Sequence, residues 1–389
     1  MRVKELTAWH VRIPLRKPIR HASHTRTDTE NLVVRCVLDD GTVGHGEGVP
    51  REYVTGETID GAVKALQQSE LPAQFDACRD FAQAVAVIER LRLAPVLGDD
   101  RNCQGNAARC AVELALLDAY GRHFREPVSA VTRLIAPDLF EPRPWVRYSG
   151  AIMATQGLKL HVTAWKMRIW RFRQLKVKVG IADQDDFKRL KVIRGVIFSG
   201  VDLRVDANEA WSPADAAQRI LELKPLRISA VEQPVPHAQV SCLAEVRKQT
   251  GVPIMLDESL CSFVDAETAL AQDTCDLFNL RLSKCGGFMP SLRLAQFARR
   301  HGLGYQLGCQ IGETALLSAA GRHFAASVRD IRYTEGSYDR YLVRESLGTR
   351  DLTFGWGGWA PALQGPGLGV DVDPAALQRV CVRKETLLG

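Results

Sequence analysis

Three acidic and two basic residues recur at nearly even intervals in the middle of the chain. Asp206, Glu232 and Asp257 each end a short apolar run, and Lys178 and Lys284 end the runs before and after them. Three carboxylates brought together repel one another unless a cation lies between them. Carboxylate oxygens without a nearby Cys or His suit Mg²⁺, with Mn²⁺ as a second choice, better than Zn²⁺. The set therefore predicts a divalent-metal site flanked by two lysines.

The lysines are the candidate acid and base groups. Lys176 and Lys178 lie two residues apart on a predicted strand, so both side chains point to one face. The ammonium of Lys176 disfavours a second positive charge on Lys178, which makes Lys178 the better proton acceptor. Lys284 arrives four strands later and would face the opposite side of a bound substrate. Two bases on opposite faces of one carbon can remove and return a proton, and the metal would stabilise the enediolate formed beside a carboxylate.

The spacing of the five residues indicates the elements that carry them. Successive charged ends are separated by 25 to 28 residues. A strand, a loop, a helix and a second loop together take roughly 20–30 residues, so each interval predicts one βα unit. Every charged residue then stands at the carboxyl end of a parallel strand. In a (β/α)₈ barrel these ends meet at one mouth, where catalytic groups are found.

Each residue alone has an ordinary explanation. An acidic residue after a strand is usually a turn residue or a helix N-cap, and a Lys-Val-Lys sequence is usually a solvated strand edge. Five such residues in step, in the order base, three acids, base, are not explained in this way.

The segments around these residues resemble the enolase superfamily, and within it the muconate lactonizing subgroup. That subgroup includes muconate cycloisomerases, o-succinylbenzoate synthases, N-acylamino acid racemases and dipeptide epimerases. The resemblance covers nearly the whole chain and is carried by Leu-Lys-Val-Lys-Val-Gly (175–180), Asp-Ala-Asn-Glu-Ala-Trp (206–211), Glu-Gln-Pro (232–234), Asp-Glu-Ser (257–259) and Leu-Ser-Lys-Cys-Gly-Gly (282–287).

The resemblance implies a role for each residue in the set. It implies Mg²⁺ held by the three acids and acid/base chemistry by Lys178 and Lys284, the known scheme of enolase-superfamily sites. The supporting residues implied at the same strand ends are Lys176, Asn208 and Asn279.

The expected fold is α/β: a (β/α)₈-type TIM barrel with an α+β capping domain. The barrel is expected over 146–350, beginning with a strand at 146–151, and two more strands after Lys284 lead to Glu313 and Glu335. Residues 1–145 lack the βα rhythm and place strands before helices, which predicts an α+β domain. By resemblance this domain closes over the barrel mouth, and residues 351–389 pack back on it.

Local patterns predict the elements of the first domain. Alternating apolar residues predict a strand over Val3–Pro14, and Asp39-Asp40-Gly41 predicts a hairpin between 31–38 and 44–48. Helical periodicity follows over 61–66, 81–93 and 107–124.

Two loops of the first domain are the expected substrate contacts under the resemblance. They supply His21 and Thr25 from one loop, and Tyr53 and Thr55 from the other. Glu313 is a further substrate-site candidate, although the sequence leading to it departs from the usual pattern of the subgroup. The alternative is that both loops are ordinary polar turns.

A basic stretch precedes the first lysine pair. Residues 159–173 carry Lys159, Lys166 and three arginines, interleaved with Trp165 and Trp170. Such a pattern can bind phosphate or nucleic acid. The βα rhythm requires a helix here, however, so we favour an outer barrel helix with a solvated basic face and expect no nucleic-acid partner. The net charge of +6 is modest for 389 residues and agrees with that choice.

Composition sets the remaining limits. The chain has no apolar run of about 18 residues and no apolar signal segment at its start, so we expect neither a membrane span nor secretion. The ten cysteines include no Cys-x-x-Cys pair, which predicts reduced thiols in a cytoplasmic protein. Assembly into a homo-oligomer is open.

These observations predict an isomerase that acts next to a carboxylate of a small substrate. We expect a reaction of the muconate cycloisomerase type. The alternatives are a racemase or epimerase of N-acylated amino acids or dipeptides, and a dehydratase of the o-succinylbenzoate synthase type. A catalytically silent member is a fourth possibility, which the intact set of five residues opposes. Against a plain dipeptide epimerase, residues 335–340 lack an Asp-x-Asp pair. Arg281 stands where many relatives have Lys, and we expect a small effect because both side chains are cationic.

Overall fold

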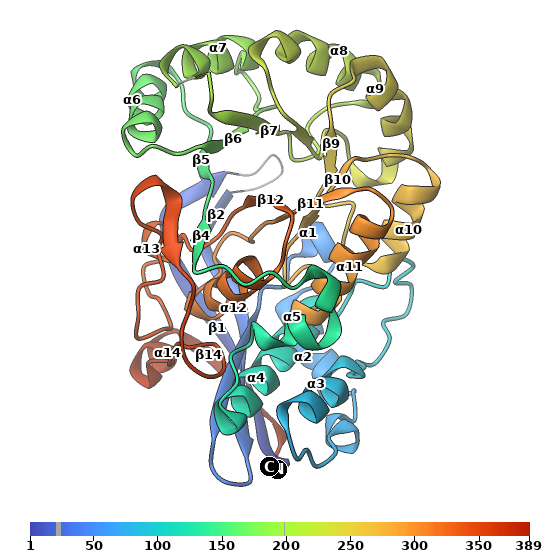
Figure 1. The fold of residues 1–389 in the computed structure, drawn as a ribbon, viewed down its shortest axis with the longest axis vertical. Coiled ribbons are helices and arrows are strands. Elements are labelled where there is room, and N and C mark those ends of the chain that lie inside the picture. Colours follow the sequence, from blue (N-terminus) through green and yellow to red (C-terminus); the bar gives the residue numbers. More distant parts are fainter. Residues whose placement is uncertain (21–24, 198) are drawn as a thin grey trace.

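The computed structural model describes residues 1–20, 25–197 and 199–389. Figure 1 shows a ring of strands edged by helices in its upper half and a long-stranded sheet with helices in its lower half. The expected α/β architecture, a barrel with a strand-rich cap, is confirmed.

The barrel consists of eight strands, and every neighbouring pair runs parallel. In spatial and chain order they are β5 (Gly150–Ile152), β6 (Gln174–Lys178), β7 (Asp202–Asp206), β8 (Val231–Glu232), β9 (Ile254–Leu256), β10 (Leu277–Leu280), β11 (Gly304–Leu307) and β12 (Ile331–Thr334). A hydrogen bond from Ser149 N to Thr334 O, 2.8 Å long, joins the last strand to the start of the first. The strands are short and almost wholly buried, as parallel strands covered on both faces must be.

Seven helices of ordinary length separate these strands. They are α6 (Gly157–Ile169), α7 (Asp186–Val196), α8 (Pro213–Leu223), α9 (Leu243–Thr250), α10 (Phe263–Ala271), α11 (Phe288–Arg300) and α12 (Ala315–Ser327). The last barrel strand is followed directly by the single turn α13 (Asp339–Leu342), which stands where a regular barrel would have its eighth helix.

The barrel also begins later than its sequence suggests. Residues 146–151 were expected to form one strand, but they divide between two sheets. Val146 belongs to β4 (Trp145–Arg147), which pairs antiparallel with β13 (Trp359–Pro361) outside the barrel. The first barrel strand starts at Gly150, because Tyr148 N turns away to bond Gly358 O.

The cap is a four-stranded antiparallel sheet with helices. Its order is β14 (Cys381–Leu388), β1 (Val3–Arg20), β2 (Thr25–Leu38) and β3 (Val43–Gly48). The C-terminal strand pairs along β1, so the end of the chain completes the first domain as expected. The predicted hairpin is present between β2 and β3. Its helices are α1 (Glu52–Thr55), α2 (Ile59–Gln67), α3 (Phe81–Glu89), α4 (Asn106–Phe124) and α5 (Ala130–Ile135), and α14 (Pro374–Val380) precedes the last strand.

Helix α4 lies directly on strand β3 because both present small residues at matching intervals. Alternate positions of β3 are glycine at 44, 46 and 48, and every fourth position of α4 from 107 to 119 is alanine. Two strand residues span about 6.6 Å and four helix residues about 6 Å, so the two rows stay in step. A Cβ atom on any of the three glycines would overlap the helix backbone.

Buried carboxylates of the cap hold helices of the barrel by their N-termini. Glu47 on β3 accepts hydrogen bonds from Thr314 N and Leu317 N at the start of α12, both 3.1 Å long. Glu113 on α4 accepts from Met289 N at the start of α11. A carboxylate at a helix N-terminus satisfies free N–H groups and interacts favourably with the helix dipole. The two domains are therefore joined by specific polar contacts as well as by apolar packing.

None of the helices in the described ranges combines the length and apolar character that crossing a membrane requires.

Candidate active site

The strand register brings the charged residues of the sequence to one end of the barrel. Lys178 pairs with Asp206 across β6 and β7, and Asp206 pairs with Glu232 across β7 and β8. Asp257 directly follows β9, and Lys284 follows β10. Because β6 and β10 are separated by three strands on either side of the ring, the two lysines enter from opposite sides of the mouth.

Lys176 is the cation at the centre of the acidic side chains. Its Nζ lies 3.4 Å from Asp206 Oδ2, 3.4 Å from Glu232 Oε1 and 2.7 Å from Glu335 Oε2. Burial opposes the charge on Lys176, but the three carboxylates raise its pKa well above the ordinary value. Its charge is therefore offset by these acids.

Arg281 is a second cation between the acids. Its Nη2 contacts Asp257 Oδ2 and lies 3.7 Å from Glu232 Oε1. Although burial opposes ionisation, Arg281 and Lys284 hold the pKa of Asp257 at about 2. Glu232 differs from Asp257, because burial raises its pKa to about 8.

Lys284 is completely buried, and its ammonium is saturated with acceptors. Its Nζ donates to Asp257 O at 2.6 Å, to Asp257 Oδ1 at 2.9 Å and to Asn279 O at 2.9 Å. Asn279 also donates from Nδ2 to Glu232 Oε1 at 2.8 Å. Asn279 thus connects the lysine on one side of the mouth with the central acid.

Lys178 is only partly buried and contacts Asn208. Its Nζ donates to Asn208 Oδ1, and Asn208 Nδ2 donates to Glu258 Oε1 at 3.2 Å. Asn208 adopts φ +43°, in the left-handed region that asparagine tolerates better than most residues. This turn also brings its N–H to Asp206 Oδ1 at 3.1 Å. A strained residue held by its neighbours in this way is typical of functional sites.

The donor chemistry of the acids fits a hard divalent cation. Glu232 Oε2 is buried and has no hydrogen-bond partner, which leaves one carboxylate oxygen free to coordinate an ion. Among the described residues no three acidic, His or Cys side chains enclose a common point. The reason is that Lys176 and Arg281 stand between the acids and neutralise them as a cation would.

The capping domain holds the loop that carries Lys284. Asn106 Nδ2 donates to Lys284 O at 2.7 Å, and Val49 N donates to Ser283 Oγ at 2.7 Å. Arg109 Nη1 donates to Gly286 O at 2.7 Å. The lysine after β10 is therefore fixed by the cap as well as by the barrel.

The substrate-loop residues take several positions. Tyr53 lies within α1, and the guanidinium of Arg26 on β2 is 5.3 Å from its ring centre. Thr55 is buried and donates to Glu57 Oε2 at 2.7 Å, which makes it an internal support of α4, whose Ala107 N bonds Glu57. The side chains of His21 and Thr25 lie outside the described residues.

Glu313 stands in the turn between β11 and α12, at the mouth end of the barrel. Its Oε1 accepts from Gln310 N at 2.6 Å, and burial raises its pKa to about 8. Among the described residues, no hydrogen bond or ion pair links Glu313 to the acids or lysines of the set. The structure thus brings together the lysines, the acids and both asparagines.

Sequence reasoning missed Arg204 and gave no role to Glu335, which it placed at the end of a strand. Arg204 on β7 is fully buried, contacts Glu335 and lies with its guanidinium 4.3 Å from the ring centre of Tyr333. Lys176 and Arg204 hold the pKa of Glu335 at about 2 against the effect of burial. Arg204 was detectable, because it stands two residues before Asp206 and must share its face of the strand.

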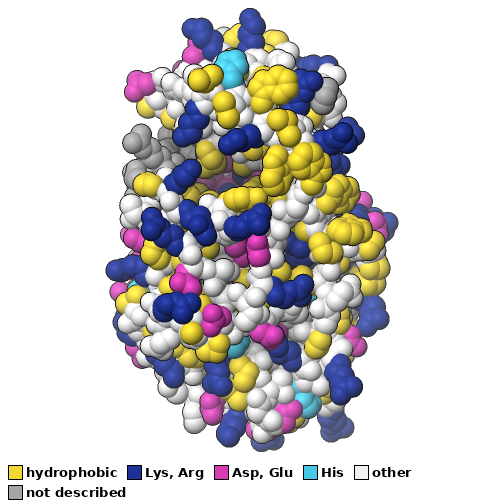
Figure 2. Space-filling model, turned by 90° about the vertical axis from the view of Figure 1, so that its left-hand side faces the viewer, with side chains coloured by type: hydrophobic (Ala, Val, Ile, Leu, Met, Phe, Trp, Pro, Cys, Tyr) yellow, Lys and Arg dark blue, Asp and Glu magenta, His cyan; other side chains and the backbone are white. Residues whose placement is uncertain are grey.

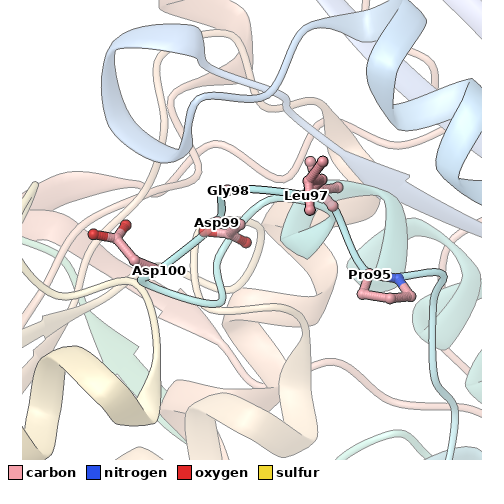
Figure 3. Close-up of a pocket in the computed structure, with 6 residues that line it drawn as sticks. Pro95, Leu97, Gly98, Asp99 and Asp100 are labelled. Atoms are coloured by element: carbon pink, nitrogen blue, oxygen red, sulfur yellow. The ribbon is translucent and has the colours of Figure 1, made fainter.

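A hollow on the molecular surface lies elsewhere. It is lined by residues 95–100 alone, a loop of the cap that leads from α3 towards α4 (Figure 3). Leu97 is fully exposed there. None of the charged residues at the barrel mouth lines this hollow, so we assign it no part in the site.

Comparison with protein families assigns both regions of the chain. Residues 3–132 match the mandelate racemase / muconate lactonizing enzyme N-terminal domain, and residues 159–376 match the enolase C-terminal domain-like family.

Individual relatives agree with this assignment. The N-succinyl-L-Arg/Lys racemase of Bacillus cereus is 26% identical over 98% of both chains, and its crystal structure superposes with a TM-score of 0.85. An L-Ala-D/L-Glu epimerase of Clostridium acetobutylicum is 30% identical over 85% of this chain and 89% of its own. A dipeptide epimerase of Enterococcus faecalis, solved with Mg and L-Leu-L-Tyr, is 26% identical with a TM-score of 0.81 over 95% of this chain and 100% of its own. The chain therefore belongs to the enolase superfamily, and it is an isomerase of that superfamily.

Proposed function

We propose that the protein is a racemase or epimerase that inverts the α-carbon of an N-acylated amino acid or a dipeptide. One observation carries the proposal: Lys178 and Lys284 enter the mouth from opposite sides, with the strands of the three acids between them. Inversion needs one group to take the proton from one face and another to return it to the other face.

This proposal reverses the order of our expectations from sequence. A cycloisomerase or a dehydratase needs one base, so a second lysine across the mouth has no necessary part in either reaction. The relatives described above are racemases and epimerases, which supports the alternative over muconate cycloisomerisation. The dehydratase remains the second candidate, because Lys178 alone would serve it.

The residues present divide the work of inversion. Lys178, held by Asn208 Oδ1, stands at the barrel mouth at the end of β6 and takes the proton of one epimer. Lys284 is held as an ammonium by Asp257, the form that donates a proton to the opposite face. In the reverse direction the roles exchange, as microscopic reversibility requires.

Asp206, Glu232 and Asp257 would hold Mg²⁺. When bound, the ion supplies positive charge that lowers the free energy of the substrate carboxylate as it gains negative charge. Holding the ion requires Arg281 to leave Asp257 Oδ2 and Lys176 to share its acids. Both cations would then remain beside the site, Lys176 through its 2.7 Å contact with Glu335.

The test is a screen for α-proton exchange in D₂O with Mg²⁺. The panel contains L,L- and D,L-dipeptides, N-succinyl-L- and N-succinyl-D-amino acids, muconate and o-succinylbenzoate precursors. We expect deuterium to enter the α-carbon of a dipeptide or N-succinyl amino acid, together with formation of its epimer, detected by NMR and chiral chromatography.

The matched controls are Lys178→Ala and Lys284→Ala, which leave the acids in place. Both should lose epimer formation. Lactone formation from muconate without α-exchange, or dehydration that survives in Lys284→Ala, would contradict the proposal and favour one-base chemistry.

A further inference from the structure

The first barrel helix, α6, has two apolar faces, and only one of them is used inside the molecule. Leu160 and Ala164 are buried against the barrel. Leu158, Val162, Trp165 and Ile169 point the other way, with 80, 46, 47 and 57% of their surface exposed. An outer helix of a barrel normally presents polar residues on its solvent side, so this second stripe requires an explanation.

The exposed stripe has the spacing of a helix-pairing seam. Its members are separated by four, three and four residues, the a and d pattern of a heptad repeat. With Val162 and Ile169 at a, the buried Leu160 falls at f, the position opposite the seam. The stripe is about 16 Å long at 1.5 Å per residue. Trp170, at the end of the helix, stacks on the half-exposed Trp356 with ring centres 5.8 Å apart and extends the apolar surface.

The flanks of the seam carry only basic side chains. Lys159 and Lys166 occupy the e positions, and His161 and Arg168 occupy the g positions. Residues at e and g face the partner helix and select it by charge. Neither Lys159 nor Lys166 has an ion-pair partner among the described residues. The chain has no acidic residue between Glu141 and Asp183, so α6 itself carries no acid that could pair with Lys159 or Lys166.

Figure 2 shows this side of the molecule, with a continuous hydrophobic area bordered by Lys and Arg side chains. Trp359 is also exposed, and its ring lies 4.9 Å from the Arg147 guanidinium. Aromatic and arginine side chains are the residues that most often anchor protein–protein contacts.

We propose that the outer face of α6 binds an acidic amphipathic helix of another protein. The partner would place apolar residues against the seam and Asp or Glu beside Lys159 and Lys166. Charge decides against a second copy of α6 in this place, because both parallel and antiparallel pairing would set its basic flanks against each other. The stripe is confined to the narrow a/d seam of helix pairing, whereas a helix that lies on a lipid surface presents a broader apolar face.

The test uses the full-length protein and two fluorescein-labelled peptides of about four heptads. Both have Leu at a and d, and one has Glu at e and g while the other has Lys. Fluorescence anisotropy at low salt should show binding of the Glu peptide and about tenfold weaker binding of the Lys peptide. The Lys159→Glu/Lys166→Glu variant should reverse this preference, and Val162→Ser/Ile169→Ser should bind neither peptide. These positions are exposed, so circular dichroism should show unchanged melting.

Three results would overturn the proposal. The first is equal binding of both peptides by the unmodified protein, or binding of neither. The second is binding to vesicles of anionic phosphatidylglycerol that Val162→Ser/Ile169→Ser abolishes, which would make the face a lipid contact. The third is an oligomer, measured by light scattering after size exclusion, that the same variant dissociates.

Discussion

The two lysines of the candidate site are held by different parts of the molecule. Lys178 depends on the barrel: Asn208 contacts its ammonium, and Arg189 of α7 donates to its carbonyl at 2.8 Å. Lys284 is fully buried and depends on both domains, because Asn106 of the cap binds its carbonyl. In the proposed inversion, a symmetric reaction would therefore be performed by an asymmetric site, in which only one base requires correct docking of the cap.

The largest effects should come from removing either base. Lys178→Ala and Lys284→Ala should each lower the rate of epimerisation by about 10³-fold or more, because general acid–base catalysis by one positioned group contributes about 10²–10⁴-fold. The rate is measured by polarimetry or chiral chromatography under saturating Mg²⁺. Full activity in either variant would contradict separate roles for the two lysines, since the remaining lysine would then serve both faces of the α-carbon.

Removal of an acid should be nearly as severe but should affect both lysines alike. Asp206→Asn should weaken Mg²⁺ binding, measured by isothermal titration calorimetry, and should lower activity by about 10²-fold or more through loss of charge stabilisation. Chelation of the metal by EDTA should have the same effect on the unmodified protein, and Mg²⁺ should restore it. Unchanged calorimetric binding by Asp206→Asn would contradict the assignment of this ligand.

Removing a polar contact between the two domains should lower the free energy of unfolding as well as the activity. Glu47→Ala leaves Thr314 N and Leu317 N at the start of α12 without their acceptor. Unsatisfied buried groups cost about 1–3 kcal/mol each, so we expect the free energy of unfolding to fall by about 3 kcal/mol. Urea denaturation measures it. A decrease of less than about 0.5 kcal/mol in the free energy of unfolding would show that Glu47 does not stabilise the contact between the domains.

The same residue makes stability depend on pH. Burial raises the pKa of Glu47 to about 7, so the folded protein holds this proton more tightly than the unfolded chain. Its contribution is complete below the ordinary value of 4.5 and is lost as pH rises through about 7. Relative to Glu47→Gln, the free energy of unfolding of the unmodified protein should therefore fall as pH rises from about 5 to about 8. Urea midpoints that change with pH by the same amount in both proteins would contradict the raised pKa of Glu47.

The smallest expected rate losses are those that distinguish the two lysines from each other. Asn106→Ala removes a 2.7 Å hydrogen bond to Lys284 O, and we expect about a tenfold loss in proton transfer by Lys284 alone, the equivalent of 1.4 kcal/mol. The matched variant Asn208→Ala should instead slow transfer by Lys178. Initial α-exchange rates from the separate epimers distinguish the two. Equal losses from both epimers in Asn106→Ala would show that the cap does not act on one base selectively.

Much of the architecture was predictable because short-range patterns determine it. Apolar runs at regular intervals predict buried parallel strands, and their charged ends must meet in a barrel. The β2–β3 turn was predictable for a similar reason, since Asp39-Asp40-Gly41 favours a tight hairpin.

The rest depends on contacts between distant residues, which spacing does not reveal. Thr55 resembles a surface-loop residue in sequence, but its hydroxyl supports a carboxylate that bonds α4. Arg204 and Glu335 compensate each other across the barrel, so neither charge has an obvious purpose when read alone. The glycines of β3 matter only because an alanine row some sixty positions later lies on them.

The most direct test of the account is α-proton exchange in the single lysine variants, followed separately for each epimer of the identified substrate in D₂O. The account predicts that Lys178→Ala exchanges the α-proton of one epimer only and Lys284→Ala that of the other, with no epimer formed by either. Exchange from the same epimer in both variants would contradict it, because the two lysines would then face one side of the substrate.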